Sequence, residues 1–487
     1  MIDPALLVAV PLAGSALPAV ASRLRPRTGW PLALSVLLVQ SALAVWVAAA
    51  ALADGPVRTQ VAGIPAPFGI GLLVDALSAP FVVLIAVAAL VVLAYTRRGG
   101  PRSGAFYSLY LLLVGGLTGV CITADVFNLY VFLEISGLAS YAMVAQADRG
   151  AAALAALKYL LVGTVGASLY LFGVGYAYVA TGTLDMAALR VALPAASDPL
   201  ALAVLGLMVL GLSVKVALFP LHTWKPDAYE TAPPGVAALL AALASTVAAY
   251  ALGRLLLAVF PGVAGAVVDA ALLGLAAASI VAGSLLAYRA ESVARLLAYS
   301  SLAQFGIVVV GFVVATPTAI AGSVVHLIGH GVMKGGSFLV VGIVTTTHDI
   351  RTVEEYAGLA RRSPYVSAGF AVLALGLIGI PPTVGFAGKF YVALGAIEAG
   401  SWTAAALVLA STLFGLVYLG RVLERMYVGE GGTHAESVGV ASPGMYAAVA
   451  VAVLATLALG GVGPLIEEWL APVLGGLDAG LAMGVIP

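Results

Sequence analysis

Charged residues are scarce in this sequence. Asp, Glu, Lys and Arg make up only 9% of its 487 residues, whereas a soluble domain carries about 25%. Hydrophobic residues make up 62%, and the mean hydropathy is +1.11. This composition excludes an ordinary soluble protein, so the rule that divides a chain into soluble domains by length does not apply. We therefore predict an all-α, multi-pass protein of the plasma membrane, surrounded by lipid.

The sequence also lacks the residues of several kinds of site. Its single cysteine, Cys121, excludes a disulfide framework and a cysteine-ligated iron–sulfur cluster. Basic and acidic residues balance at 22 each and form no basic tract, which argues against a nucleic-acid partner. No phosphate-binding loop, dinucleotide fingerprint or catalytic triad is found, so we predict no cofactor and no catalytic centre in this chain. Any redox chemistry must belong to another subunit, and membership of an enzyme complex stays open.

Long apolar runs occupy most of the chain. A helix needs about 20 apolar residues to span a bilayer, and this rule predicts fourteen spanning helices. The first run is interpreted as a helix rather than a cleaved signal, because Asp3 and no basic residue precede it. The connections are too short for a separate globular domain. The approximate helix cores are 5–22, 30–53, 76–95, 106–122, 126–145, 153–180, 199–219, 235–259, 264–287, 293–315, 318–346, 365–397, 402–427 and 443–475.

Basic residues in the loops predict the orientation of the chain. With loops alternating and the N-terminus outside, fifteen basic residues lie on the cytoplasmic side and two, Arg58 and Arg190, lie outside. Multi-pass membrane proteins show this positive-inside bias, so both termini are predicted to lie outside the cytoplasm. The fifteen are Arg23, Arg25, Arg27, Arg97, Arg98, Arg102, Arg149, Lys225, Arg289, Arg295, Arg351, Arg361, Arg362, Arg421 and Arg425.

Two predicted helices contain a proline break near an intramembrane lysine. Pro220 follows Lys215 in the seventh helix, and Pro381 precedes Lys389 in the twelfth, 161 positions after Pro220. Five helices fit in each interval, so we predict two units of opposite topology with a transport pathway at the broken helices. The predicted units are N-terminal helices at 1–105, a first inverted repeat at 106–259, a second at 260–427, and a C-terminal loop and helix at 428–487.

Glu134 and Lys215 are ionisable residues inside apolar helices. Such residues are costly in hydrocarbon and mark functional sites by default. A lysine that can be charged or neutral takes up and releases protons, and a nearby carboxylate favours its charged form. Movement of Glu134 would therefore switch Lys215. The alternative is a static ion pair that fixes helix packing.

Three residues of the segment HLIGHGVMKGG recur at intervals of four. These are His326, His330 and Lys334, and the spacing predicts that they share one helix face. Histidine titrates near neutrality, so this face could relay protons. Two alternatives stay open. One is a hydrogen-bonded packing face, and the other is a metal held by the two histidines, although no HExxH glutamate or third ligand accompanies them.

Three further basic residues allow two interpretations each, Lys389 in helix twelve and His222 and Lys225 where helix seven reaches the cytoplasmic side. Lys389 forms the outer end of a pathway, or it snorkels to the outer interface. His222 and Lys225 form an access path from the cytoplasm, or their segment is an interfacial belt around Trp224. Arg254 is interpreted as structural.

Four segments resemble a known family. They are VKVALFPLHTWKPDAYETAPPGVAALL, FNLYVFLEISGLASY, ARLLAYSSLAQFG and HLIGHGVMKGGSFLVVG, within roughly residues 105–395. They are similar to the proton-conducting, antiporter-like membrane subunits of respiratory complex I, membrane-bound hydrogenases and Mrp sodium/proton antiporters. The resemblance implies fourteen helices, two inverted five-helix repeats, and discontinuous helices seven and twelve. The pathway residues that it implies are Glu134, Lys215, His326, His330, Lys334 and Lys389.

Two positions refine the resemblance. The helix-twelve position is a lysine here, Lys389, rather than a glutamate. In this respect the chain resembles the smaller complex I subunit or the Mrp D subunit. Many members have a lysine in helix eight, four residues before a tyrosine, and alignment on Tyr250 places Thr246 there, with Ser245 beside it. A hydroxyl can hold water but cannot carry the charge. The relay then runs through water and His330, or this subunit conducts poorly.

These observations leave three functions open. The leading hypothesis is translocation of protons, or their exchange for sodium, by a protein similar to the D subunit of an Mrp-type sodium/proton antiporter. The second is a proton-pumping subunit in the membrane arm of an NADH:quinone oxidoreductase or a membrane-bound hydrogenase. The third is a structural subunit whose channel is impaired at Thr246. In all three, the partners are other membrane subunits of a hetero-oligomeric complex.

Overall fold

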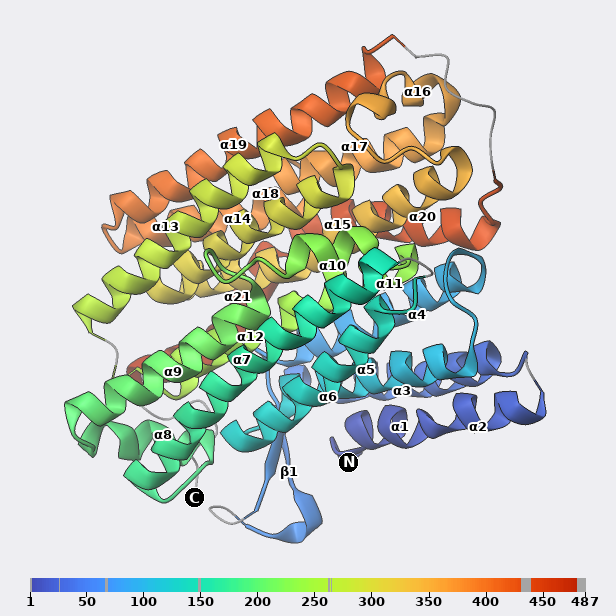
Figure 1. The fold of residues 1–487 in the computed structure, drawn as a ribbon. Helices are drawn as coiled ribbons and strands as arrows, with labels where there is room; N and C mark the ends of the chain where they lie inside the picture. The colour runs from blue at the N-terminus through green and yellow to red at the C-terminus, as the bar shows by residue number, and fades with distance from the viewer. Residues whose placement is uncertain are drawn as a thin grey trace.

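Long helices dominate the computed structural model, which describes residues 2–25, 27–65, 69–147, 150–261, 263, 265–430 and 439–479. Within these ranges thirteen helices are long and apolar enough to cross a membrane. They run side by side, with the short helices α8 (Met186–Ala192) and α16 (Leu359–Arg362) at opposite ends of the bundle (Figure 1). Helices suit this setting because they satisfy their own backbone hydrogen bonds. The prediction of an all-α, multi-pass membrane protein is confirmed.

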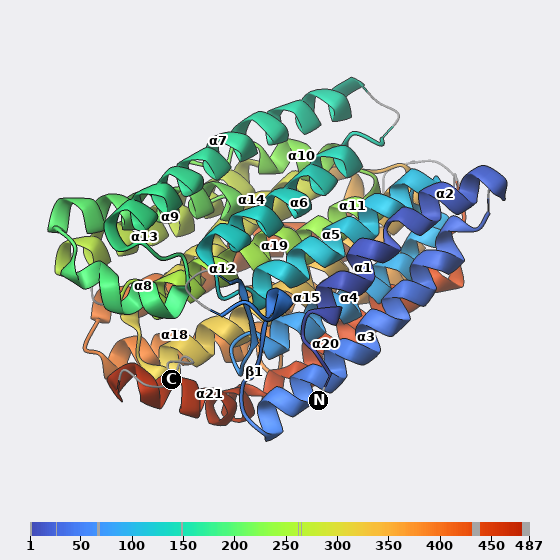
Figure 2. The ribbon, with the colours of Figure 1, turned by 90° about the horizontal axis from the view of Figure 1, so that it is seen from below.

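The first helices form one flank of the bundle. Helix α1 (Leu6–Gly14) continues after Ser15 into α2 (Ala16–Leu24), and both pack against α3 and α5 (Figure 2). The next helices add α6 and α7 beside them. Their bounds are Gly29–Ala53 for α3, Ala79–Gly99 for α4, Gly104–Ile122 for α5, Val126–Val144 for α6 and Gly150–Thr181 for α7.

A β-hairpin interrupts the connection between α3 and α4, where the sequence had suggested only a loop. Strand β1 (Val57–Gln60) pairs antiparallel with β2 (Gly71–Val74), and the hairpin projects from the bundle (Figure 1). The backbone oxygen of Gly71 accepts a hydrogen bond from the amide of Ala124 at 2.9 Å. The hairpin is therefore fastened to the turn between α5 and α6.

The seventh predicted helix is discontinuous. Helix α9 (Asp198–Val216) ends where Ala217 adopts a left-handed conformation with φ of 68°. An irregular turn containing Pro220, which has no backbone N–H to donate, leads into the short helix α10 (Lys225–Thr231). The eighth predicted helix follows as α11 (Pro234–Leu239), a π-helical turn at Leu240–Ala244, and α12 (Ser245–Ala258).

The second half of the chain also contains a discontinuous helix. The twelfth predicted helix is two helices, α17 (Pro364–Ile378) and α18 (Val384–Glu398), separated by Gly379 and the two prolines. Because the spanning helices found number thirteen plus this broken pair, the count of fourteen stays a prediction. The other helices here are α13 (Ala266–Arg289), α14 (Val293–Val314), α15 (Pro317–His348) and α19 (Trp402–Tyr427).

The last predicted helix is shorter than expected. Helix α20 (Pro443–Ala458) stops at a 3₁₀ turn, Leu459–Gly461, and α21 (Gly463–Ala479) then packs against α15 and α18. Glycines at the junction, which weaken a helix, explain the division of the 443–475 run. The predicted loop residue Arg149 and parts of the predicted 428–487 unit lie outside the described residues.

Candidate functional site

Glu134 and Lys215 form an ion pair between α6 and the last turn of α9. The Lys215 Nζ lies 2.8 Å from Glu134 Oε1 and donates a second hydrogen bond, at 3.1 Å, to the Tyr141 hydroxyl. The side chains are 9% and 21% exposed. The pair thus lies directly beside the break that follows α9.

Aromatic rings hold the broken segment against α7. The Trp224 ring stacks on Tyr159 at a centroid distance of 4.0 Å, and Tyr159 contacts Tyr141 at 4.5 Å. The Trp224 Nε1 donates to the backbone oxygen of Val214 at 2.9 Å, and the side chain is 1% exposed. The interpretation of Trp224 as an interfacial belt is therefore wrong, because a belt residue faces the headgroup region rather than the core.

Lys225 was counted among the basic residues of the cytoplasmic loops and the helix ends beside them, and the structure places it at a helix end with its side chain inside the protein. The residue begins α10 and is 1% exposed. Its Nζ donates to the backbone oxygen of Val216 at 3.1 Å and lies 4.5 Å from the centre of the Phe305 ring. The signal in the sequence was the proline break before it, because a broken helix can turn back into the protein before it restarts.

His222 lies in the turn between α9 and α10. Its ring is 5.4 Å from that of Phe219 and 6.0 Å from that of Tyr299, and the residue is 8% exposed. In the described part of the chain, its Nδ1 has no hydrogen-bond partner. His222 therefore lies near the break without a direct hydrogen bond to Lys215.

His326, His330 and Lys334 all point from one face of α15 into the protein, and each is at most 1% exposed. The His326 Nε2 is 2.9 Å from Gln304 Oε1, and Lys334 donates to the Leu297 backbone oxygen at 2.7 Å. Lys334 also bonds the Ser300 hydroxyl, and the imidazole of His330 lies 4.6 Å from the ring of Phe305. Gln304 and Ser300 were missed as site residues, although both stand out as polar residues in the apolar run ARLLAYSSLAQFG.

The structure does not support the metal site considered for His326 and His330 on α15. Among the residues that the structure describes, no three His, Cys, Asp or Glu side chains gather as a metal site. The partners of the histidines are instead an amide and a hydroxyl. The arrangement can pass protons or fix the packing of α15 against α14.

Thr246 and Ser245 connect the two halves of the site. The Thr246 Oγ1 is 3.4 Å from Nδ1 of His330, and Ser245 Oγ donates to the backbone oxygen of Lys215 at 3.3 Å. Both residues lie at the start of α12, directly after its π-helical turn. The side chains of two successive residues therefore contact the backbone of Lys215 and the imidazole of His330.

Lys389 points back into the protein rather than towards the outer interface. It is 4% exposed, and its Nζ donates to the backbone oxygens of Leu377 at 3.2 Å and Ile378 at 2.9 Å. These carbonyls end α17, where the helix dipole is negative. The snorkelling interpretation is therefore wrong.

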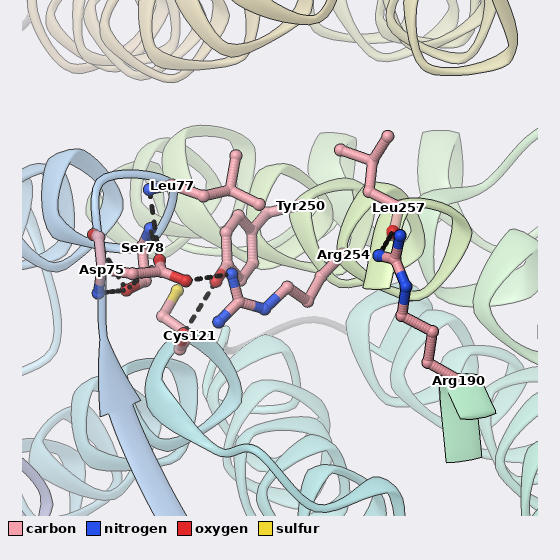
Figure 3. Close-up of polar contacts among 8 residues, drawn as sticks. All are labelled: Asp75, Leu77, Ser78, Cys121, Arg190, Tyr250, Arg254 and Leu257. Carbon is pink, nitrogen blue, oxygen red and sulfur yellow. Dashed lines mark hydrogen bonds and ion pairs between the residues drawn. The ribbon is translucent and has the colours of Figure 1, made fainter. Parts of the chain in front are cut away.

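Two other groups of charges lie apart from these residues. Arg254 pairs with Asp75 at 2.6 Å, and Asp75 also accepts hydrogen bonds from the amides of Leu77 and Ser78 (Figure 3). Nearby, Tyr250 donates to the backbone oxygen of Cys121 at 2.8 Å (Figure 3). At the other end of the bundle, a second network joins α7, α10 and α14. Its members are Lys158, Asp227, Glu230 and Arg295.

Comparisons with known proteins point to one group. Residues 123–415 match the family described as NADH:quinone oxidoreductase/Mrp antiporter, transmembrane. NADH-quinone oxidoreductase subunit N of Desulforudis audaxviator is 41% identical over 437 residues, which cover 87% of this chain and 86% of that protein. The D subunit of the Na(+)/H(+) antiporter of Bacillus subtilis is 30% identical over 419 residues, 84% of this chain and 83% of that one.

A solved structure agrees with these relatives. A chain of the membrane-bound sulfane sulfur reductase, an archaeal respiratory membrane complex, superposes with a TM-score of 0.90. It is 28% identical in sequence, and the match covers 97% of each chain.

Proposed function

The chain belongs to the NADH:quinone oxidoreductase/Mrp antiporter transmembrane family, and on that premise we propose that it translocates protons as one subunit of a multisubunit membrane complex. The observation that carries the proposal is the Glu134–Lys215 ion pair beside the break between α9 and α10. An intramembrane charge pair at a discontinuous helix is the kind of site at which transport proteins bind and move ions.

The proposed pathway continues from this pair through the centre of the protein. Contacts of Ser245 and Thr246 lead from Lys215 to His330. The α15 face, with His326 and Lys334, then leads towards Lys389. His222 is proposed to lie on the access side. Five ionisable side chains of this path are buried, and such residues inside a membrane protein mark proton pathways. They are His222, His326, His330, Lys334 and Lys389.

We further propose the architecture around the pathway. The units 106–259 and 260–427 are inverted repeats, each with one discontinuous helix, and 1–105 and 428–487 flank them. Both termini lie outside the cytoplasm. Removing the buried Lys225 from the cytoplasmic group leaves a bias of fourteen basic residues against two, which still supports this orientation.

The choice between a redox-driven complex and an antiporter is a finer proposal. Identity is higher to the N subunit of an oxidoreductase than to the D subunit of an antiporter, so we favour the membrane arm of a redox complex over the Mrp-type assembly. Mass spectrometry of the complex purified through a tag on this chain distinguishes them. Iron–sulfur subunits support the redox complex, whereas small membrane subunits alone support the antiporter.

The test of proton translocation is Lys215→Ala. Inverted membrane vesicles are energised with NADH or given a sodium gradient, and proton uptake is followed with a pH-sensitive dye. Uptake should be abolished while the amount of assembled complex is unchanged, because the switching charge is gone. Arg190→Ala is the control, since Arg190 is a partly buried cation outside the pathway that bonds the backbone oxygen of Leu257. Normal uptake by Lys215→Ala would refute the proposed mechanism.

A further inference from the structure

Lys225 is a buried cation with no acidic partner. Within the described ranges, no carboxylate lies at ion-pair distance from its Nζ. The Nζ is held by the backbone oxygen of Val216 and by the faces of three rings, at 4.5 Å from Phe305, 5.6 Å from Tyr229 and 5.9 Å from Trp224. A carbonyl and ring faces stabilise an ammonium group, yet no ion pair has to break when the amine gives up its proton.

The position of Lys225 is also central. Its backbone amide donates to the backbone oxygen of His222, in the turn after α9, at 3.0 Å. On its other side, Phe305 contacts both the Lys225 ammonium and the His330 ring, at 4.5 and 4.6 Å.

The second half of the chain contains the same arrangement. Lys389 lies on α18 and donates to the last carbonyls of α17, while Lys225 lies on α10 and donates to the last carbonyl of α9. In both cases a buried lysine on the second half-helix caps the C-terminus of the first. Its ammonium group then neutralises the negative end of that helix.

We propose that Lys225 is a proton-carrying residue of the pathway, a junction between the α9–α10 break and the histidines of α15. This inference rests on the proposed function. The proton that leaves the Lys215 ammonium group is taken up by the neutral Lys225 amine. It then passes to the imidazole of His330, which becomes imidazolium and leaves Lys225 neutral again. Each transfer moves one proton and changes no other bond.

The test compares Lys225→Met and Lys225→Arg in the purified complex and in energised vesicles. Uptake of protons should fall on the order of 100-fold in both, the scale of losing a positioned proton-transfer group. Arginine keeps the cation and its donors but does not release a proton in proteins. A lysine with only a packing role would be replaced by arginine without loss. Arg190→Met, which removes a cation outside the pathway, is the control and should behave as wild type.

A further variant covers the case in which Lys225→Arg does not assemble. Thr246 touches His330, so Lys225→Met combined with Thr246→Lys supplies a new amine beside the same imidazole. Recovery of uptake over Lys225→Met alone supports the proposal, and no recovery overturns it. Normal uptake in Lys225→Met or in Lys225→Arg also overturns it. Lys215→Ala in the same assay separates the two proposals. If the Lys225 variants pump normally and Lys215→Ala does not, only the role of Lys225 is refuted. If Lys215→Ala also takes up protons normally, the proposed function itself is refuted.

Discussion

The buried cations of this protein are stabilised in two different ways. Lys215 and Arg254 each have a carboxylate partner, Glu134 and Asp75. Others, such as Lys389, are held by main-chain carbonyls at the ends of broken helices. A carboxylate pair resists separation because each charge would be left buried and alone. The Asp75–Arg254 pair, whose side chains are 3% and 5% exposed, is therefore suited to a structural role. The Glu134–Lys215 pair, which we propose to switch, is more exposed and lies beside the helix break.

The Asp75–Arg254 pair should act as a structural link. Arg254→Met leaves the Asp75 carboxylate buried without its cation, which costs about 3–5 kcal/mol for a pair of this kind. The thermal midpoint of the purified complex in mild detergent should fall clearly. Asp75→Asn added to Arg254→Met should restore part of the loss, because no charge is then left unpaired.

The control for this prediction lies beside the pair. Arg190 donates one hydrogen bond, to the backbone oxygen of Leu257 at 3.3 Å, and is only partly buried (Figure 3). Arg190→Met should shift the midpoint little. Equal midpoints for Arg190→Met and Arg254→Met would contradict the structural role of the pair.

The two broken helices are the elements that place the site. Prolines at 220 and 381 predicted both breaks, because a residue without a backbone N–H cannot continue the hydrogen-bond ladder. The interval of four likewise predicted that His326, His330 and Lys334 share a face. The direction of the chain after each break could not be predicted. It depends on the irregular residues 217–224, and so the burial of Lys225 could not be predicted.

Close contact between α15 and α18 should be sensitive to one added methyl group. A Cβ at Gly388 would lie 2.6 Å from the Cβ of His326 and 2.7 Å from its Cα. Gly388→Ala should therefore force the helices apart and destabilise the protein by about 1–3 kcal/mol, the usual range for overpacking. The measurement is the thermal midpoint of the complex, together with proton uptake, since His326 would be displaced.

Gly420→Ala is the matched control for this contact. Gly420 lies in α19, and a Cβ there would meet nothing within 4 Å. Alanine favours a helix over glycine by about 1 kcal/mol, so this variant should be as stable as the wild type or slightly more stable. A Gly388→Ala protein that melts no lower than Gly420→Ala would refute the tight contact.

At the scale of the whole molecule, composition alone predicted the fold class, because 9% charge and 62% hydrophobic residues fit only a protein surrounded by lipid. The β-hairpin at Val57–Val74 escaped prediction, since its two short strands carry no strong alternation of polar and apolar residues. The division between α20 and α21 escaped it as well. Hydropathy shows how long an apolar run is. It does not show that the run bends at the end of α20 so that α21 can pack against α15.

The orientation of the chain can be tested with single cysteines. Cys121 is buried, so the natural chain gives little background with a thiol reagent. Ser197→Cys, exposed before α9, should react with a membrane-impermeant maleimide in intact cells. Glu354→Cys, at a side chain that is 70% exposed, should react only after the cells are permeabilised. The reverse pattern would place both termini in the cytoplasm.

The carbonyl-held lysines have a genetic consequence. Lys225 and Lys389 are bound by main-chain oxygens of Val216, Leu377 and Ile378, and every amino acid supplies such an oxygen. No codon change at those three positions removes the acceptor itself. The partner of Lys215, by contrast, is the carboxylate of Glu134, which a single missense change deletes. A random mutant library selected for loss of function should therefore yield alleles at Glu134 far more often than at the three residues whose backbones hold the other lysines.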